Sequence, residues 1–463
     1  MKINTITKGL LALGLVSAAG IAQASSTIDI GGQTYNEVFL TGSSAARGNI
    51  FNAVSAASGG VFDSAPTLVT AGLGAPPTGS TGNYTAYGKI GGQNYCLCMS
   101  FTGSEAGLWA IQHNVSGIPN AVAQDTLNGN PAYPNAVIPG TPNPTSFVNP
   151  NDGTTFEAQA DLAMADTSQA VSLSPSPALT DYGVVGAVTF YWMKGKNSSP
   201  DSSWNNLVNV TTPQLNYLLS GPTKASYFTG VATNADYVFV VGRNKASGTH
   251  QNTMLDTLHG TTVAVDQWVP GNCTYNGSGQ LSDANGTTQT PLATAGLVEV
   301  FNDGFDSGSG VSHSLMCDGT GSVNVLSQGS SIYTGPVILL GYLGVGDATA
   351  PKSAGAQVLT VNGVAESDAT VINGTYSYWG HEHLYGVVSP SAATVTVAHA
   401  LAGTTYVGGF GSGYGTPNGA IQNAGGLGGG GSDLANTHSS IIAPNYMQCD
   451  KPNGGDSGYP AQL

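Results

Sequence analysis

The sequence is short of charge, and above all of positive charge. Only 11 of its 463 residues are Lys or Arg, against 26 Asp and Glu, which gives a formal net charge of −15 at pH 7. Proteins that bind nucleic acid need a basic face for the phosphate backbone, so nucleic acid is excluded as a partner. Because charged residues make up 8% of the chain, the surface must consist mainly of Ser, Thr, Asn, Gln and Gly.

Long apolar runs are missing as well. The apolar stretch Gly9–Ala22 is too short to span a bilayer, and it follows two basic residues, Lys2 and Lys8. It ends in an A-x-A cleavage signal that finishes at Ala24. Residues 1–24 are therefore predicted to be a signal peptide cleaved after Ala24. We expect a periplasmic or extracellular protein with no transmembrane segment after cleavage.

Cysteine is scarce, with five residues in the chain. In an exported protein disulfides are the default expectation, so at least one is predicted, and the odd number leaves one thiol over. Cys96 and Cys98 share one face of a predicted strand, with Cα atoms about 6.6–6.8 Å apart, and are poorly placed to bond each other. Cys273 and Cys317 are candidates for a pair. Zinc is disfavoured because no C-x-x-C spacing occurs.

Sequence signatures of common enzymes are absent too. The chain contains no G-x-S-x-G, no H-E-x-x-H and no G-x-x-x-x-G-K-[ST]. His381 and His383 alternate onto one face of a predicted strand, but no third metal ligand is identifiable. We therefore predict a protein that is not an enzyme and that has neither a cofactor nor a metal.

What the chain does have is one local design used three times. An apolar strand runs into a small polar turn, and a helix with an apolar face follows. The three segments are NEVFLTGSSAARGNIFNAVSAASGG at 36–60, NYCLCMSFTGSEAGLWAIQHN at 94–114 and DYVFVVGRNKASGTHQNTMLDTLHG at 236–260. In the first, Ser44 is the expected helix N-cap and Gly59 the expected stop. Such repetition predicts an α/β fold.

The third segment carries one of the rare cations at a strand end. Arg243 lies two residues after the strand that ends at Val241, and Ser247-Gly248-Thr249 begins the helix four residues later. A helix N-terminus favours an anion through its free N–H groups and its dipole. The arginine fork matches two anion oxygens at once. These features predict an anion site, with an ordinary surface cation as the alternative for Arg243.

Six segments, taken in order, resemble the phosphate-binding subunit of bacterial ABC phosphate importers, a type 2 periplasmic binding protein. They are LTGSSAA at 40–46, TGSEAGL at 102–108, DLAMADTS at 161–168, VTTPQLNYLLSG at 210–221, GRNKASGT at 242–249 and INGTYSYWGHEHLYG at 372–386. The resemblance extends from about residue 36 to 385, with large insertions, and returns near the C-terminus. It implies a two-lobed α/β fold with a hinge and long Gly/Asn/Thr-rich loops.

The resemblance also implies an organisation and a function. The first lobe would take residues 25–178 and 375–463, with a Gly-rich stretch at 403–431, and the second lobe 179–374. The protein would capture inorganic phosphate or a related protonated oxyanion, possibly for an ABC permease. The alternative is a secreted or surface-attached structural or adhesive protein that reuses the fold, which low charge, many insertions and the Gly-rich stretch favour.

Matching the family residue by residue implies these ligand contacts: Ala46, Arg47, Ser104, Asp166, Arg243, Ser247, Gly248 and Thr249. Ala46 and Arg47 stand where the family has a threonine and an aromatic residue. Lys245-Ala246 replaces the family's Asp-Gly, so together with Arg47 it predicts a more positive mouth. For Ser104 a plain N-cap, and for Arg47 a solvated side chain, remain as alternatives.

Asp166 decides which anion the site accepts. A carboxylate repels an anion unless the anion brings a proton, which monohydrogen phosphate does and sulfate at neutral pH does not. A site that must fill such an acceptor rejects the analogue without a donor by roughly 10⁴-fold in favourable cases. Asp166 is therefore predicted to select for phosphate, with a structural turn or cap as the alternative.

Overall fold

The structure is a computed structural model of the whole chain. It describes residues 26–79, 81–112, 145–172, 179–275, 281–282, 289–404, 419–421, 441–442, 446–451 and 461–462. The predicted signal peptide and its cleavage site, and nearly all of the Gly-rich stretch 403–431, lie outside the described residues. In the part that is described, every helix is too short or too polar to cross a bilayer.

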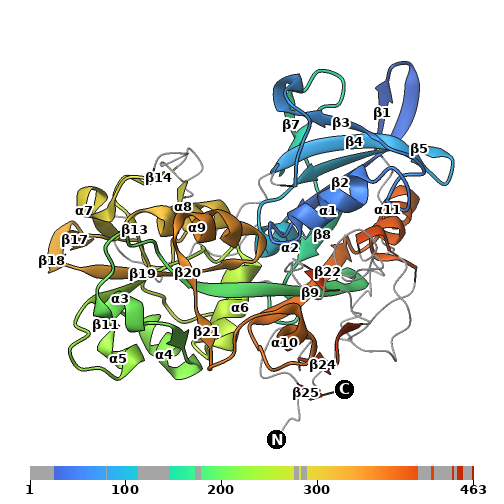
Figure 1. Cartoon of the computed structure of the whole chain (residues 1–463). Helices are drawn as coiled ribbons and strands as arrows, with labels where there is room; N and C mark the ends of the chain where they lie inside the picture. Colours follow the sequence, from blue (N-terminus) through green and yellow to red (C-terminus); the bar gives the residue numbers. More distant parts are fainter. Residues whose placement is uncertain are drawn as a thin grey trace, which may run out of the picture.

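Two lobes share one continuous mixed sheet (Figure 1). Its strands follow the order β11-β12-β19-β9-β22-β8-β2-β5-β4-β3. Strand β9 (Thr180–Lys194) belongs to both lobes, because its first ten residues pair with β22 and its last five with β19. The fold is thus a two-lobed α/β arrangement, as predicted, and β9 is the strand that links the lobes.

The first lobe contains the sheet from β22 to β3 with three helices. Strands β2, β5 and β8 are parallel, whereas β22 runs antiparallel to both β8 and β9. Its elements are β1 (Thr27–Ile30), β2 (Gln33–Gly42), α1 (Arg47–Ser55), β3 (Thr67–Thr70), β4 (Asn83–Ile90), β5 (Gln93–Ser100), α2 (Ser104–Gln112), β6 (Thr145–Val148), β7 (Thr155–Ala158), β8 (Leu162–Ala165), β22 (Trp379–Gly386) and α11 (Ala392–Ala402).

Alternation along β2 assigns the first lobe's helices to opposite faces of its sheet. Val38 and Leu40 point into one core with apolar residues of α1 and α11. Phe39 between them points into another core, with Leu108 and Ile111 of α2. Successive strand residues face opposite sides of a sheet, so both faces of this sheet are covered.

The second lobe repeats this layering around β12 and β19, which are parallel. Val238 and Val240 of β12 pack with residues of α4 and α6, whereas Phe239 and Val241 pack with α8. Its main elements are α3 (Ser202–Asn206), α4 (Thr212–Leu218), β11 (Thr223–Lys224), α5 (Ser226–Thr229), β12 (Tyr237–Val241), α6 (Gly248–Asp256), α8 (Gly308–Met316), β19 (Val337–Gly344), α9 (Thr349–Ala354) and β20 (Gln357–Val358).

Smaller elements complete the described chain. A side sheet of β13 (Trp268–Pro270), β16 (Leu297–Glu299), β17 (Val323–Ser327) and β18 (Ser330–Gly335) flanks the second lobe. The rest are β10 (Asn209–Val210), β14 (Thr274–Tyr275), β15 (Leu281–Ser282), α7 (Leu292–Ala295), β21 (Thr360–Val361), α10 (Asp368–Ile372), β23 (Ile441–Ile442), β24 (Cys449–Asp450) and β25 (Ala461–Gln462).

The predicted helix ends needed correction in two places. Helix α1 begins at Arg47 after Ala46, so Ser44 is not its N-cap, and it ends at Ser55, before the predicted stop at Gly59. Ala46 adopts a helical backbone conformation and, having no polar side chain, gives no side-chain cap. Leu258, which lies four positions after Met254 and would share its inner face if α6 continued, lies beyond the helix end and is 69% exposed.

No disulfide joins the described cysteines. The Sγ atoms of Cys96 and Cys98 are 3.9 Å apart and not bonded, as their shared strand face predicts. Cys273 lies near Cys317, and burial together with this neighbour raises the pKa of the Cys317 thiol to about 12. The predicted disulfide is thus not formed in this structure, although its candidate pair is close in space.

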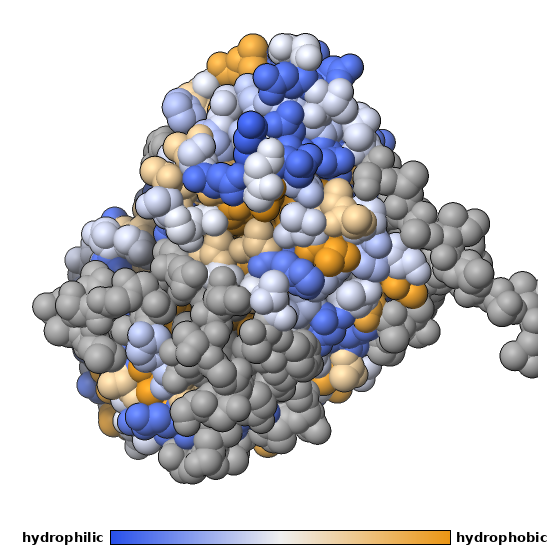
Figure 2. Space-filling model, turned by 90° about the vertical axis from the view of Figure 1, so that its right-hand side faces the viewer, coloured by the Kyte–Doolittle hydropathy of each residue, from blue (hydrophilic) through white to orange (hydrophobic). Residues whose placement is uncertain are grey.

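On the face shown in Figure 2, hydrophilic and weakly polar residues dominate the coloured surface of the upper part. Hydrophobic residues appear there in smaller groups, mostly towards the middle. This mixture fits the prediction of a surface rich in small neutral polar residues.

Candidate anion-binding site

The centre of the site is a buried carboxylate at a strand end in the first lobe. Strand β8 ends at Ala165, and Asp166, the next residue, is 1% exposed. Ser104, the first residue of α2, donates its hydroxyl to Asp166 Oδ1. The backbone N–H of Asp166 in turn donates to Ser104 Oγ at 3.2 Å. The first side chain of α2 therefore contacts this carboxylate, whereas the backbone N–H groups of Glu105 and Ala106 donate to the carbonyl of Ala246, at 3.1 and 3.3 Å.

The second lobe brings another helix N-terminus to the same carboxylate. Thr249, near the start of α6, donates its hydroxyl to Asp166 Oδ2 at 3.3 Å. At Gly248 an added Cβ would lie 1.6 Å from Asp166 Oδ1, so only glycine allows this approach. Ser247 serves as the N-cap, with its hydroxyl accepting from the His250 N–H at 3.3 Å. Two helices from two lobes thus meet on one acid.

Arg243 lies at the same junction and is 2% exposed. Its Nε donates to the carbonyl of Phe305 at 3.2 Å and its Nη2 to the carbonyl of Asp306 at 2.8 Å. Its Nη1 reaches across to the hydroxyl of Ser44 in the first lobe, 3.5 Å away. These contacts exclude the alternative of an ordinary surface cation.

The electrostatics of the site are set by burial. Burial raises the pKa of Asp166 above its usual range, while the hydroxyl of Ser104, the charge of Arg243 and the hydroxyl of Thr249 oppose that rise. A carboxyl group in such surroundings holds a proton, or shares one with a neighbour, more readily than an exposed one. An acceptor for a protonated anion must be ionised, so Ser104, Arg243 and Thr249, which oppose the rise in the pKa, favour the form of Asp166 that such a site requires.

Ala46 and Arg47 lie at the edge of the site. The backbone N–H of Ala46 donates to Ser43 Oγ at 3.3 Å. Arg47 directs its Nε to the carbonyl of Gly79 at 3.3 Å and its Nη2 towards Asp347 Oδ1 at 3.9 Å. Arg47 therefore faces a pocket of about 220 Å³, lined by both lobes, with 18% of its side chain exposed.

The more positive mouth stays a prediction, and further acids act on Arg243. Arg243 is electrostatically coupled to Asp347 and Asp306 as well as to Asp166. Asp347 and Asp306 come from segments far along the chain, so the sequence next to Lys245 does not predict that they lie near Arg243. They supply the negative charge that the missing acid before Ser247 would have given.

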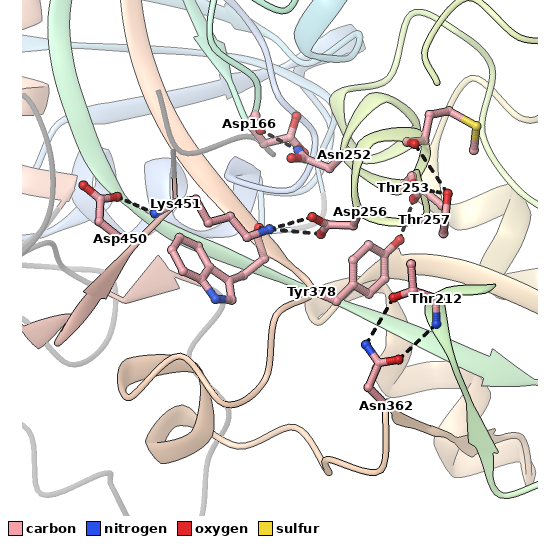
Figure 3. A network of polar contacts seen from close by, with 12 residues as sticks. Asp166, Thr212, Asn252, Thr253, Asp256, Thr257, Asn362, Tyr378, Asp450 and Lys451 are labelled. Carbon is pink, nitrogen blue, oxygen red and sulfur yellow. Dashed lines mark hydrogen bonds and ion pairs between the residues drawn. The ribbon is translucent and has the colours of Figure 1, made fainter. Parts of the chain in front are cut away.

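A second layer of polar contacts holds α6 in position. The amide of Asn252 donates to the backbone carbonyl of Asp166 at 2.6 Å, which Figure 3 shows, and to that of Gly248 at 3.2 Å. His250 Nδ1 lies 2.8 Å from the hydroxyl of Tyr342, and burial lowers the pKa of His250 to about 3. The ring is therefore uncharged at neutral pH.

His381 and His383 do not form a metal site with other described residues. Their ring centroids are 5.8 Å apart on β22, and His381 Nε2 lies 2.9 Å from Asp450 Oδ1. Within the described ranges, no group of three or more His, Cys, Asp or Glu could hold a metal ion.

Sequence reasoning missed several residues of this site. Ser44 had been assigned as a cap, whereas Asp347, Asn252 and Tyr342 were not considered. Asn252 and Thr249 lie three positions apart on α6, so helical spacing from Thr249 could have identified Asn252. Nothing local distinguishes Asp347, which reaches the site only through the fold.

Several solved structures resemble this chain at low sequence identity. The chain is similar in fold to solved phosphate-binding proteins. A putative phosphate ABC transporter substrate-binding protein from Clostridium perfringens, solved with bound phosphate, matches at 10% identity with a TM-score of 0.37, over 78% of this chain and 91% of that one. An ABC-type phosphate transport receptor from Vibrio cholerae matches at 12% identity with a TM-score of 0.35, over 77% and 90%.

A possible phosphate-binding protein from Planctomyces limnophilus matches at 10% identity with a TM-score of 0.32, over 76% of this chain and 82% of that one. No protein family matches the chain, and no curated protein matches it in sequence. At such low TM-scores the likeness says nothing about a ligand, so the case for one rests on the contacts described above.

Proposed function

We propose that this protein is an exported solute-binding protein that captures phosphate, or a related protonated oxyanion, between its two lobes. One observation carries the proposal. The N-termini of α2 and α6, from different lobes, meet at the buried carboxylate of Asp166 beside the buried Arg243. Helix N-termini and a buried guanidinium are suited to an anion, and the carboxylate is suited to an anion that carries a proton.

Each group has a distinct role in this proposal. The hydroxyls of Ser104 and Thr249, which donate to Asp166, would turn to donate to anion oxygens. Arg243 would supply the charge-assisted contact. Asp166, whose ionised form Ser104, Arg243 and Thr249 favour, would accept a hydrogen bond from the proton of the bound anion. Sulfate offers no proton at neutral pH, so it would leave this acceptor unfilled. Uptake through an ABC permease is part of the proposal.

A structural role is the second candidate, and one observation favours it. Asp166 already accepts hydroxyl bonds from Ser104 in its own lobe and Thr249 in the other. The carboxylate could therefore act as a permanent link between lobes, with no ligand involved. A secreted or surface-attached protein that reuses the fold would need only this link.

Calorimetric titration separates the two candidates. The purified mature protein is titrated at neutral pH with phosphate, arsenate and sulfate. Phosphate and arsenate should bind, and sulfate should bind more weakly by up to roughly 10⁴-fold. Absence of heat with all three anions, in protein shown to be folded, would favour the structural candidate.

Replacing Arg243 tests the assignment of the site. Arg243→Ala should weaken phosphate binding by roughly two to four decades, because two hydrogen bonds to a charged group are lost at about 1.5–3 kcal/mol each. Lys224→Ala is the matched control, since it removes one positive charge from an exposed residue on edge strand β11. Thermal unfolding checks that both variants are folded. Unchanged phosphate affinity in Arg243→Ala contradicts the proposal.

A further inference from the structure

The pocket beside the anion site is larger than a phosphate contact requires. It measures about 220 Å³ and is lined by four glycines, with Ser44, Arg47 and Asp347 as its polar side chains. One water needs about 10–15 Å³ of such space, so the pocket can take a group of several non-hydrogen atoms. Ser44 and Arg47 belong to the first lobe, and Asp347 to the second, so lobe closure would enclose whatever lies there.

This pocket and the anion site share one guanidinium. Ser44 Oγ, in the pocket wall, lies 3.5 Å from Nη1 of Arg243. The negative charges of Asp166 and Asp347 both favour the charged form of Arg243 by raising its pKa. A phosphoryl group held by Arg243 would therefore have Asp166 on one side and the pocket with Asp347 on the other.

The lining of the pocket favours hydroxyl groups. Arg47 Nη2 and Asp347 Oδ1 are 3.9 Å apart, too far for a hydrogen bond. Their side chains are 18% and 16% exposed, so donors and an acceptor face each other across a partly buried gap. Ala45 is the one apolar side chain of the lining. An aromatic or lipid-like group would gain little there, whereas a hydroxyl could donate to Asp347 and accept from Arg47.

We propose that the preferred ligand is a phosphate monoester of a small polyol or sugar, with its phosphoryl group at Arg243 and Asp166 and its hydroxyls in this pocket. The inference rests on the proposed function and extends it from an inorganic to an organic ligand. Free phosphate would leave the pocket without a group that could hydrogen-bond to both Arg47 and Asp347, which are 3.9 Å apart. A hydroxylated substituent supplies that group.

Titration of the wild-type protein tests the ligand class. A monoester has a second pKa near 6, so measurements at pH 6 retain the protonated form that Asp166 accepts. Glycerol 3-phosphate and glucose 6-phosphate should bind at least tenfold more tightly than inorganic phosphate. Phenyl phosphate should show no such gain, and glycerol alone should not bind.

Filling the pocket tests its role. An added Cβ at Gly346 meets no atom within 4 Å, so Gly346→Leu can be accommodated and its side chain can occupy the pocket. This variant should remove the tenfold preference for glycerol 3-phosphate and leave inorganic phosphate within about twofold of wild type. Inorganic phosphate is thus the internal control for folding and for the anion site.

The failures of the two proposals are distinguishable. If inorganic phosphate binds as tightly as both polyol monoesters, the ligand class is wrong while the proposed function stands. An equal loss of both ligands in Gly346→Leu would show that the pocket is not a separate subsite. If neither phosphate nor any monoester binds the folded wild-type protein, the proposed function itself fails.

Discussion

Helix α6 has a carboxylate at each end, Asp166 buried and Asp256 with 10% of its side chain exposed, and the two are stabilised in different ways. At its N-terminus, Asp166 of the other lobe accepts hydrogen bonds from the hydroxyls of Ser104 and Thr249. At its last residue, Asp256 accepts two bonds from Lys451 Nζ, at 2.8 and 3.0 Å (Figure 3). The helix dipole favours the first carboxylate and disfavours the second, so only the second needs a cation in contact.

The difference distinguishes an exchangeable contact from a fixed one. The side chain of Lys451 is fully buried, and its ammonium also donates to the carbonyl of Trp379 at 2.5 Å. Separating that pair would leave two charges without partners in the core. The hydroxyls on Asp166 are neutral donors that can turn to another acceptor at small free-energy change. We infer that α6 is anchored at its C-terminal end and open to a ligand at its N-terminal end.

The largest expected effect comes from breaking the fixed end. Lys451→Met leaves Asp256 as an unpaired buried charge and should lower the free energy of unfolding by about 3–5 kcal/mol. Urea denaturation measures the loss. The double variant Lys451→Met/Asp256→Leu should recover most of it, because both charges are then gone. A single variant as stable as wild type would mean that the pair does not anchor the helix.

Neutralising each carboxylate in turn sharpens the comparison. Asp166→Asn should weaken phosphate modestly and improve sulfate, because an amide can donate to an anion oxygen. We expect the phosphate-to-sulfate affinity ratio to narrow by tenfold or more. Asp256→Asn removes a charge from the other end of α6 and should leave that ratio unchanged, whatever it does to stability. Equal ratios in Asp166→Asn and wild type would remove Asp166 as the selectivity residue.

A third carboxylate, the buried Asp161 at the opposite end of β8 from Asp166, has neither hydroxyl donors nor a lysine partner in the part of the chain that the structure describes. Its replacement should have the smallest effect on stability. Asp161 accepts the backbone N–H of Phe39 at 2.9 Å, and burial raises its pKa from 3.8 to about 6. The folded protein therefore binds this proton more tightly than the unfolded chain does. The stability it contributes is complete below pH 3.8 and is lost as the pH rises through about 6.

Lowering the pH from 7 to 5 should therefore stabilise the protein by about 1 kcal/mol through this group. Urea denaturation of wild type and Asp161→Asn at both pH values isolates the contribution, since the other acids titrate in both proteins. The gain should be about 1 kcal/mol smaller in the variant. Identical pH profiles would show that Asp161 titrates normally in the folded state.

Local pattern indicates Arg243, which lies two residues after the strand that ends at Val241, because strand ends are where such folds bind ligands. Asp166 and Thr249 are implied as contacts by the family resemblance, and the binding role of all three stays a prediction. The periods of the strands and helices also predicted the α/β layering. The contacts that could not be predicted join residues far apart in the sequence. Lys451 bonds to Asp256 across 195 positions. Asp347 comes near Arg243 only once the second lobe has folded.

Some errors had local causes. Ser44 has the right chemistry for a cap, but α1 begins at Arg47, and Ser44 contacts Arg243 instead. The disulfide prediction assumed that exported cysteines pair, yet Cys449 donates its thiol to the carbonyls of Val371 and Ile372. A buried thiol can thus be satisfied by backbone acceptors.

The position of β22 in the sheet constrains the order in which the chain can fold during synthesis. This strand, at residues 379–386, lies between β8 and β9 and pairs with both. Until the ribosome has made it, the sheet of the first lobe lacks the neighbour that joins it to the linking strand. Pairing at such long sequence separation is slow. The nascent chain therefore remains without its complete central sheet until more than three quarters of it has been translated.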